Sequence, residues 1–318
     1  MRALVVSNMR PDAPNPGRGS FVRDQVDALR GLPDVQVDLF EFPPGGPALA
    51  RAAATLRRDH GAHAYDLVHA HFGLSAWPAL TVGARARVLT VHGTDVRHPR
   101  TGLLTRAVLG RMDLVAAASA SLAAELGGTA ARPVAVLPCG VNTTRFRPLD
   151  RRAARAAIGL DAQRPYLLFP ADPARAGKRH DLARRAAGVT PLLTLGGVEP
   201  AQMPLWINAA NAVLVPSDAE GFGLAVLEAL ACDVPVLATP VGVHPLALGG
   251  VAGTLCAPFE TLRWQRALAP HVHAADPRVQ GRARAELFSS PRMAERVACA
   301  WRAILADAGA QPSGPGRG

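Results

Sequence analysis

The stretch that decides the fold of this chain runs from Ala212 to Ala231 and reads AVLVPSDAEGFGLAVLEALA. Its first four residues are apolar and typical of a buried strand. A Pro-Ser turn and a glycine-bearing loop follow, and a helical stretch begins at about Gly223. A strand, a glycine loop and a helix in this order indicate a parallel α/β sheet, in which ligands bind at the carboxyl ends of the strands.

The same alternation continues through most of the chain in both directions. Towards the N-terminus we expect strands at 2–7, 35–40, 66–71, 87–92, 113–117 and 134–137, and helices at 20–31, 47–59, 74–83, 101–111 and 119–127. A Pro- and Arg-rich segment at 145–165 holds a short helix at 151–158. A second series follows, with strands at 165–170, 191–195, 212–215 and 234–238 and helices at 178–187, 203–210, 223–232, 259–270, 276–287 and 291–306.

These patterns predict an α/β protein with two Rossmann-like domains facing each other across a cleft. A chain of 318 residues exceeds one comfortable hydrophobic core, which also favours two domains. We place the first domain at residues 1–160 and the second at 161–290, with the helix at 291–306 packing back on the first. Residues 309–318 are rich in Gly and Pro and have the composition of a disordered tail.

The composition is that of a globular protein, with 49% apolar and 19% charged residues. Of the formal net charge of +10, about eight units lie within residues 1–160. Basic domains bind nucleic acid, anionic membrane surfaces or phosphorylated substrates. Nucleic acid is not expected, because aromatic residues make up only 5% and do not interleave with the basic ones. The alternative is that the excess arginines are simply solvated surface charges.

The four cysteines are far apart and form no C-x-x-C motif, as in a reduced cytosolic protein. The N-terminus begins with a strand pattern and not with a signal segment. No apolar run reaches the roughly 18 residues that span a bilayer. We therefore expect a cytoplasmic protein, with peripheral contact to the inner membrane face left open.

The loop from Glu220 to Gly223 and the helix after it could bind a polar ligand. Backbone N–H groups at a helix N-terminus hold hydroxyl or phosphate oxygens, and glycines let a ligand approach the backbone closely. Glu220 and Glu228 are eight residues apart, so both can lie on one side of the turn and helix. The alternative is an amphipathic helix with a capping acid and a solvated one, which the glycine-aromatic-glycine context disfavours.

This block resembles the donor-site signature of family 4 retaining glycosyltransferases of the GT-B fold. The similarity extends over about residues 1–260 and includes several segments in matching order: Arg18 to Arg23, His69 to Gly73, Val91 to Asp95, Leu137 to Pro148, Gly177 to Arg179, Leu195 to Gly197 and Val234 to Gly242. The resemblance implies a first domain that binds the acceptor and a second domain that binds a nucleotide-sugar donor. It implies no cofactor apart from this co-substrate and no metal.

The resemblance also implies roles for individual residues. Glu228 would hold the nucleotide ribose, while Glu220 and the backbone of Gly221, Phe222 and Gly223 would hold hydroxyls of the donor sugar. His92 would lie beside the sugar, Gly17 and Gly19 would approach the diphosphate, and Lys178 would neutralise it. His92, Lys178 and Glu220 are thus the catalytic candidates.

Lys178 is the only lysine in the chain. A compact ammonium suits a diphosphate that gains charge as the sugar bond breaks, whereas a cation at a helix start opposes the helix dipole unless an anion is near. The family usually places an arginine shortly before this lysine, but Asp172 takes that position here. Either Arg175 or Arg179 would then make the second phosphate contact, and we favour Arg175.

The acceptor side is assigned to His71, Asp95, Arg106 and Arg111. His69, His71, His92, Asp95 and His98 could instead form a zinc site, but no Cys, Glu or further His lies at a short ligand spacing. Residues 101–112 place Leu104, Val108 and Met112 on one stripe beside the two arginines, and Arg51, Arg57 and Arg58 form another basic segment. Such faces suit an anionic membrane or a phosphorylated lipid, and the alternative is ordinary packing of the stripe on the sheet.

We therefore expect a retaining transferase that moves a hexose from a GDP- or UDP-linked donor. No carboxylate is clearly placed as a nucleophile, which favours a front-face path in which the leaving diphosphate accepts the acceptor's proton. A nucleotide-sugar epimerase and a non-catalytic nucleotide-sugar binder of the same fold are the alternatives. The G-x-S-x-G, P-loop and G-x-G-x-x-G motifs are absent from the sequence.

Overall fold

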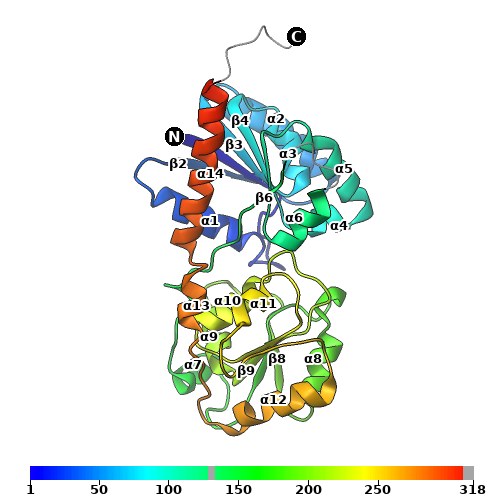
Figure 1. Cartoon of the computed structure of the whole chain (residues 1–318), viewed down its shortest axis with the longest axis vertical. Helices are drawn as coiled ribbons and strands as arrows, with labels where there is room; N and C mark the ends of the chain where they lie inside the picture. Colours follow the sequence, from blue (N-terminus) through cyan, green and yellow to red (C-terminus); the bar gives the residue numbers. More distant parts are fainter. Residues whose placement is uncertain (128–132, 311–318) are drawn as a thin grey trace. The chain divides into compact units, whose positions relative to one another are not determined.

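The computed structural model describes residues 1–127 and 133–310, and these form two compact units (Figure 1). The first unit comprises residues 1–11, 21–139 and the C-terminal segment from 291, and the second comprises residues 12–20 and 140–290. Residues 140–160 therefore belong to the second unit, although we expected the boundary at about 160. No helix in the described ranges is long and apolar enough to cross a membrane.

The first unit is built on a six-stranded parallel sheet in the order β2-β1-β3-β4-β5-β6. Its strands are β1 (Arg2–Ser7), β2 (Gln36–Glu41), β3 (Tyr65–His71), β4 (Ala84–Val91), β5 (Leu114–Ala117) and β6 (Ala135–Val136). The register pairs His71 with both Ser7 and Thr90, near the carboxyl ends of three neighbouring strands. The sheet therefore brings the end of β3 and the residues after β4 together.

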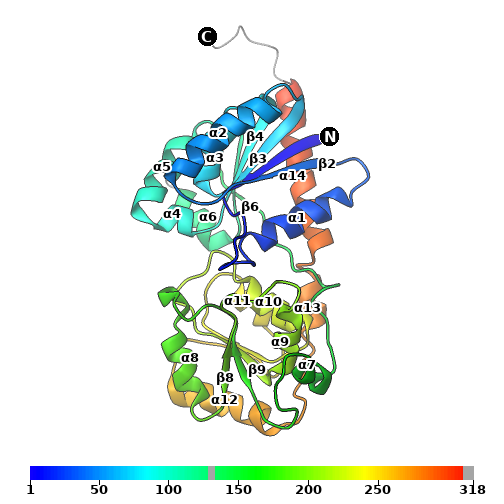
Figure 2. The same cartoon turned by 180° about the vertical axis from the view of Figure 1, so that it is seen from behind.

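Helices cover both faces of this sheet, because its strands are apolar on both sides. On one face, α1 (Ser20–Arg30) and α14 (Ser290–Ala310) bury Val26, Val297 and Trp301 against the strands (Figure 1). On the other face lie α2 (Gly46–His60), α3 (Gly73–Ala79), α5 (Pro99–Leu109) and α6 (Ala120–Gly127) (Figure 2). The short α4 (Thr94–Arg97) precedes α5.

The second unit is built on a five-stranded parallel sheet in the order β11-β10-β9-β7-β8. Its strands are β7 (Leu167–Phe169), β8 (Leu192–Thr194), β9 (Ala212–Val215), β10 (Val236–Ala238) and β11 (Leu255–Cys256). Its helices are α7 (Arg151–Ala157), the 3-10 helix η1 (Ala176–Lys178), α8 (His180–Ala187), α9 (Met203–Ala209), α10 (Leu224–Ala231), α11 (His244–Leu248), α12 (Thr261–His273) and α13 (Arg282–Glu286). Trp264 of α12 is fully buried in the core with the strands and α8.

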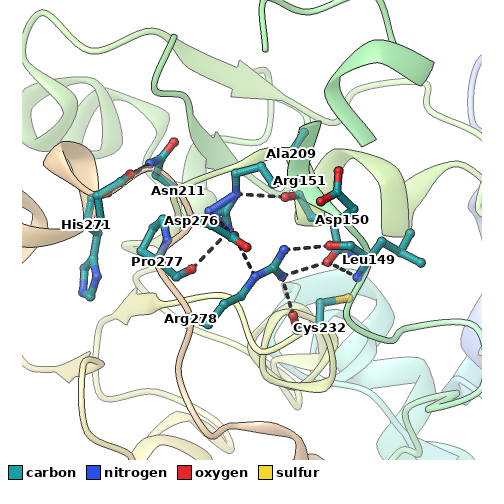
Figure 3. Close-up of polar contacts among 12 residues, drawn as sticks. Leu149, Asp150, Arg151, Ala209, Asn211, Cys232, His271, Asp276, Pro277 and Arg278 are labelled. Carbon is teal, nitrogen blue, oxygen red and sulfur yellow. Dashed lines mark hydrogen bonds and ion pairs between the residues drawn. The ribbon is translucent and has the colours of Figure 1, made fainter. Parts of the chain in front are cut away.

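A buried arginine, Arg151, and a partly buried one, Arg278, join the segment before β7 to the rest of the second unit (Figure 3). Arg151 Nε donates to Asn208 O at 3.2 Å, its Nη2 donates to Pro277 O at 3.1 Å, and its Nη1 lies 3.0 Å from Asp276. Arg278 donates to Leu149 O at 2.7 Å and to Cys232 O at 2.9 Å. Two of these carbonyls, those of Asn208 and Cys232, lie at the C-terminal ends of α9 and α10, where helices leave acceptors without an internal partner. The network explains why residues 140–160 fold with this unit.

Some elements differ from the sequence prediction. The helix expected at 178–187 is interrupted at Arg179, which adopts a left-handed conformation with φ 57° between η1 and α8. Only residues 282–286 of the helix expected at 276–287 form, as α13, and the short α4, α11 and β11 were not predicted. α14 extends to Ala310, beyond the expected start of the tail, and residues 311–318 lie outside the described residues.

Candidate functional site

The loop between β9 and α10 carries a buried ion pair. Lys178 Nζ donates to Glu220 Oε1 at 2.6 Å and to Oε2 at 2.7 Å, and Ser217 Oγ also donates to Oε1 at 2.7 Å. The exposed fraction of the side chain is 9% for Glu220 and 20% for Lys178. Two of the catalytic candidates are thus in direct contact in the second unit, although 42 residues separate them in the sequence.

The ammonium determines the charge state of Glu220. Burial alone raises the pKa of this carboxyl, because a carboxylate loses hydration in the interior. The charge and hydrogen bonds of Lys178, with a smaller contribution from Ser217, outweigh burial and hold the pKa of Glu220 below its ordinary value. Glu220 is therefore an anion at neutral pH and accepts hydrogen bonds only.

The loop from residue 220 to 223 is tightly packed on the segment after β10. Val243 N donates to Phe222 O at 2.7 Å, and Gly223, with φ 103°, precedes the first turn of α10. A Cβ on Gly223 would lie 2.5 Å from His244 Nε2, and a Cβ on Gly242 would lie 2.3 Å from Phe222 O. Glycine is required at both positions by close contacts as well as by the positive φ angles.

His244 was not identified from the sequence, although its side chain packs against Gly223 of this loop. Its side chain is fully buried, and Nδ1 donates to Thr239 O at 2.8 Å. Burial lowers the pKa of His244, so the ring is neutral, and Nε2 faces Gly223 without a hydrogen-bond partner in the described part of the chain. A lone histidine gives no sequence signal for this contact.

The loop that carries Lys178 is fixed by ion pairs of its neighbour. Arg179 donates to Asp181 at 2.9 Å and to Asp218 at 2.9 Å, and Asp218 N donates to Gly177 O at 3.0 Å. These contacts hold the Lys178 loop beside the Glu220 loop. They also leave Arg179 engaged with two carboxylates, whereas the Arg175 side chain is exposed, with no ion pair or hydrogen bond between it and another described residue.

The other expected donor-site residues belong to the same unit. Glu228 is partly buried and lies in the second turn of α10, after the loop. The Phe222 ring is buried, 6.2 Å from the ring of Phe288, so only its backbone is available to a ligand. Gly17 and Gly19 lie in the segment 12–20, which groups with the second unit, and Gly19 has φ 70°.

In the first unit, His71 and His92 form one stack at the ends of β3 and β4. Their rings are 5.2 Å apart, and His71 Nδ1 lies 3.0 Å from His92 Nε2. His71 is fully buried, whereas His92 is partly exposed. Burial lowers the pKa of both rings, so both are neutral at physiological pH. His71 thus lies behind His92.

The Asp95 carboxylate is buried and bonded to the backbone. It accepts from Gly93 N at 2.8 Å, from His92 N at 3.0 Å and from Gly73 N at 3.1 Å. Burial raises the pKa of Asp95, and these N–H groups oppose the shift. The side chain joins the loop after β4 to the start of α3, which fixes the backbone of His92.

The arginines of the expected acceptor side lie at the surface near α5. Arg106 Nη1 is 3.4 Å from Val96 O, and the Arg111 guanidinium is 5.6 Å from the centre of the Trp77 ring. The apolar stripe expected beside them is divided, because Val108 and Met112 are buried in the core while Leu104 is 45% exposed. Among the described residues, no three His, Cys, Asp or Glu side chains gather in an arrangement that could hold a metal ion.

Comparisons with known proteins find glycosyltransferases. Residues 4–145 match the profile of Glycosyltransferase Family 4, and residues 172–270 match that of Glycosyl transferases group 1. D-inositol 3-phosphate glycosyltransferase of Mycolicibacterium paratuberculosis is 30% identical over 302 residues, covering 78% of this chain and 68% of the relative. The enzyme of the same name from Segniliparus rotundus is 30% identical, covering 77% of this chain and 68% of its own.

Solved structures show the same fold. Sucrose-phosphate synthase from Thermosynechococcus elongatus has a TM-score of 0.74 at 21% identity and covers 96% of this chain and 99% of its own. Anabaena HepE in complex with UDP and glucose has a TM-score of 0.70 at 15% identity, with 95% and 99% covered. The expected GT-B architecture of two parallel-sheet α/β domains is confirmed. With its two profile matches and its relatives, the chain belongs to glycosyltransferase family 4.

Proposed function

We propose that this glycosyltransferase moves a hexose from a GDP- or UDP-linked donor to its acceptor with retention at the anomeric carbon. The observation that carries the proposal is the buried Lys178–Glu220 pair at the glycine loop before α10. It places a cation and a hydrogen-bond acceptor side by side, as a sugar diphosphate requires. Anabaena HepE, which shares the fold, has been crystallised in complex with UDP-glucose, and this supports a nucleotide-sugar donor here.

In this proposal each charge serves a different part of the donor. Lys178 would neutralise the diphosphate, and Arg175 is the better second phosphate ligand because Arg179 is already engaged with Asp181 and Asp218. Glu220 would accept hydrogen bonds from sugar hydroxyls, since an anion has no proton to donate. Glu228, farther along α10, would accept from the ribose hydroxyls.

Retention follows most simply from a front-face path. The bond between the anomeric carbon and the diphosphate oxygen breaks, and the acceptor oxygen bonds to the same face of that carbon. The acceptor's proton passes to the leaving diphosphate, whose charge Lys178 and the loop N–H groups stabilise. The protein then acts mainly by positioning and by electrostatics.

For the acceptor we propose an anionic compound or a lipid-linked one. The first unit holds 18 basic and 12 acidic residues, an excess of six positive charges, and two relatives are named for D-inositol 3-phosphate. A phosphorylated acceptor would be attracted to such a surface, and this attraction weakens with salt. Inositol phosphate is therefore the first acceptor to test, followed by phosphorylated lipids in vesicles.

The test is incubation of the full chain with a panel of GDP- and UDP-sugars, with and without acceptors, while release of the nucleoside diphosphate is measured. Acceptor-dependent release, with the anomeric configuration of the product determined by NMR, supports the proposal. Conversion of the sugar nucleotide without diphosphate release would indicate an epimerase. Saturable binding without turnover for any acceptor would indicate a nucleotide-sugar binder.

A further inference from the structure

Three side chains of the first unit form a hydrogen-bonded chain that ends at His92. The side-chain amide nitrogen of Gln25 lies 3.1 Å from His71 Nε2, and His71 Nδ1 lies 3.0 Å from His92 Nε2. Gln25 and His71 are buried. Nδ1 of His92 has no hydrogen-bond partner in the described ranges, so it is the open end of this series of hydrogen bonds.

The side-chain amide of Gln25 determines which atom donates in each of these hydrogen bonds. An amide nitrogen only donates, so the nitrogen of His71 that faces it must be the unprotonated one, Nε2. A neutral imidazole carries one N–H, which in His71 must then be at Nδ1 and donates to His92 Nε2. Burial lowers the pKa of His71 to about 3, which keeps the ring neutral. The single proton of a neutral His92 is left at Nδ1.

The His92 ring is also held in its orientation. The Phe21 ring lies 4.9 Å from it and the Phe72 ring 4.6 Å. Phe72 has φ 69°, a conformation that costs a bulky residue about 1–3 kcal/mol and that persists only where the surroundings impose it. His71 is stacked between His92 and His69, with ring centres at 5.2 Å and 4.5 Å. Because both rings are packed in this way, neither His71 nor His92 can rotate by 180° and exchange its two nitrogens without displacing its neighbours.

We propose that Gln25 and His71 are positioning residues that fix His92 as the Nδ1–H tautomer. His92 then presents a hydrogen-bond donor at its open edge, suited to a lone pair on a ligand oxygen such as that of a sugar hydroxyl. The tautomer assignment stands on the geometry of the first unit alone. Its consequence for turnover rests on the proposed function, so the two are measured separately.

The tautomers can be observed directly in the full chain labelled with 15N-histidine. Long-range 1H–15N spectra distinguish the protonated from the unprotonated nitrogen of each ring, and His71→Asn and His92→Ala assign the signals. We expect a proton on Nδ1 and none on Nε2 in both His71 and His92. Gln25→Glu, which replaces the donor with an acceptor, should bring a proton to His71 Nε2. A proton on Nε2 of either ring in the unchanged chain overturns the proposal.

His71→Asn and His71→Asp form a matched pair of nearly equal size for the kinetic consequence. The Asn amide can donate to His92 Nε2 as His71 does, whereas the Asp carboxylate only accepts and requires the His92 proton at Nε2. We expect kcat to be about tenfold lower in the Asp variant than in the Asn variant, as for the loss of one hydrogen bond. Equal kcat values with the expected spectra would overturn the effect on turnover and leave the tautomer assignment supported. A chain with no transferase activity at all would instead count against the proposed function.

Discussion

Replacement of Lys178 with Met tests the energetic basis of the candidate donor site. Met keeps most of the length and the apolar stem of the side chain but removes the ammonium that lies 2.6 and 2.7 Å from the two Glu220 oxygens. Glu220 would keep the Ser217 hydrogen bond but would be a buried anion without its cation. Removing one partner of a buried ion pair costs about 3–5 kcal/mol, and the partial exposure of Lys178 reduces this to about 2–3 kcal/mol.

The loss of stability caused by Lys178→Met should be larger at neutral pH than at acid pH. In the unchanged chain the pKa of Glu220 is lowered, so its contribution to stability is present above the unfolded-state pKa and is lost as the pH falls through the folded-state pKa. Without Lys178, burial raises this pKa, so the anion destabilises the variant above the unfolded-state pKa and protonation relieves it. The difference in stability between the two chains should therefore be large at about pH 7 and should shrink towards about pH 4.

Thermal unfolding of the full chain, followed by circular dichroism across this pH range, measures the effect. A loss of about 2–3 kcal/mol corresponds to a Tm lower by roughly 5–10 °C for a unit of this size. Arg175→Met, which removes an exposed charge from the same loop, is the matched control and should leave Tm nearly unchanged. Adding Glu220→Gln to Lys178→Met should restore part of the stability. The reasoning is refuted if the Tm difference is independent of pH and Glu220→Gln restores nothing.

Four further changes test other parts of the site and fold. Glu228→Ala should weaken binding of the free nucleoside diphosphate, and unchanged affinity by calorimetry would remove its assignment to the ribose. His92→Ala should lower kcat much more than it weakens donor binding, whereas equal losses would point to misfolding of the first unit. Gly223→Ala should destabilise the chain by at least about 1–3 kcal/mol in urea unfolding, because of its φ of 103° and the contact with His244. Arg151→Met removes the donors to the carbonyls of Asn208 and Pro277, while Asp276 keeps Arg278, and should cost about 1–3 kcal/mol in the same assay; an unchanged stability would contradict the role of the arginine network.

Local patterns predicted most of the fold. The strand at 212–215 forms as expected, and most other strands and helices lie within a few residues of their predicted ranges, because apolar runs and turn residues act over short distances. The break at Arg179 could not be predicted in this way. Its left-handed backbone is fixed by an ion pair with Asp218, which is 39 residues away in the sequence.

In the candidate site, too, local patterns identified some residues, whereas contacts between distant parts of the sequence could not be predicted. Glu220, Gly221 and Gly223 were identified because they follow a strand and open a helix, which is a local pattern. The direct contact between Lys178 and Glu220 and the packing of His244 under the loop depend on how β7, β9 and β10 are ordered in the sheet. Val108 and Met112 were included in a candidate surface stripe because helical periodicity cannot tell which face meets the sheet.

For the proposed function, the Lys178–Glu220 ion pair affects how tightly the site binds the intact donor relative to the product diphosphate. Without a ligand, each charge neutralises the other, so neither is buried alone. A diphosphate that takes Lys178 removes a hydrogen-bond donor from Glu220, and the carboxylate then needs new donors to remain an anion in its buried position. The hydroxyls of a hexose can supply them, whereas a nucleoside diphosphate without a sugar cannot. The same two side chains would thus favour the intact donor over the product diphosphate, which assists release of that product after transfer.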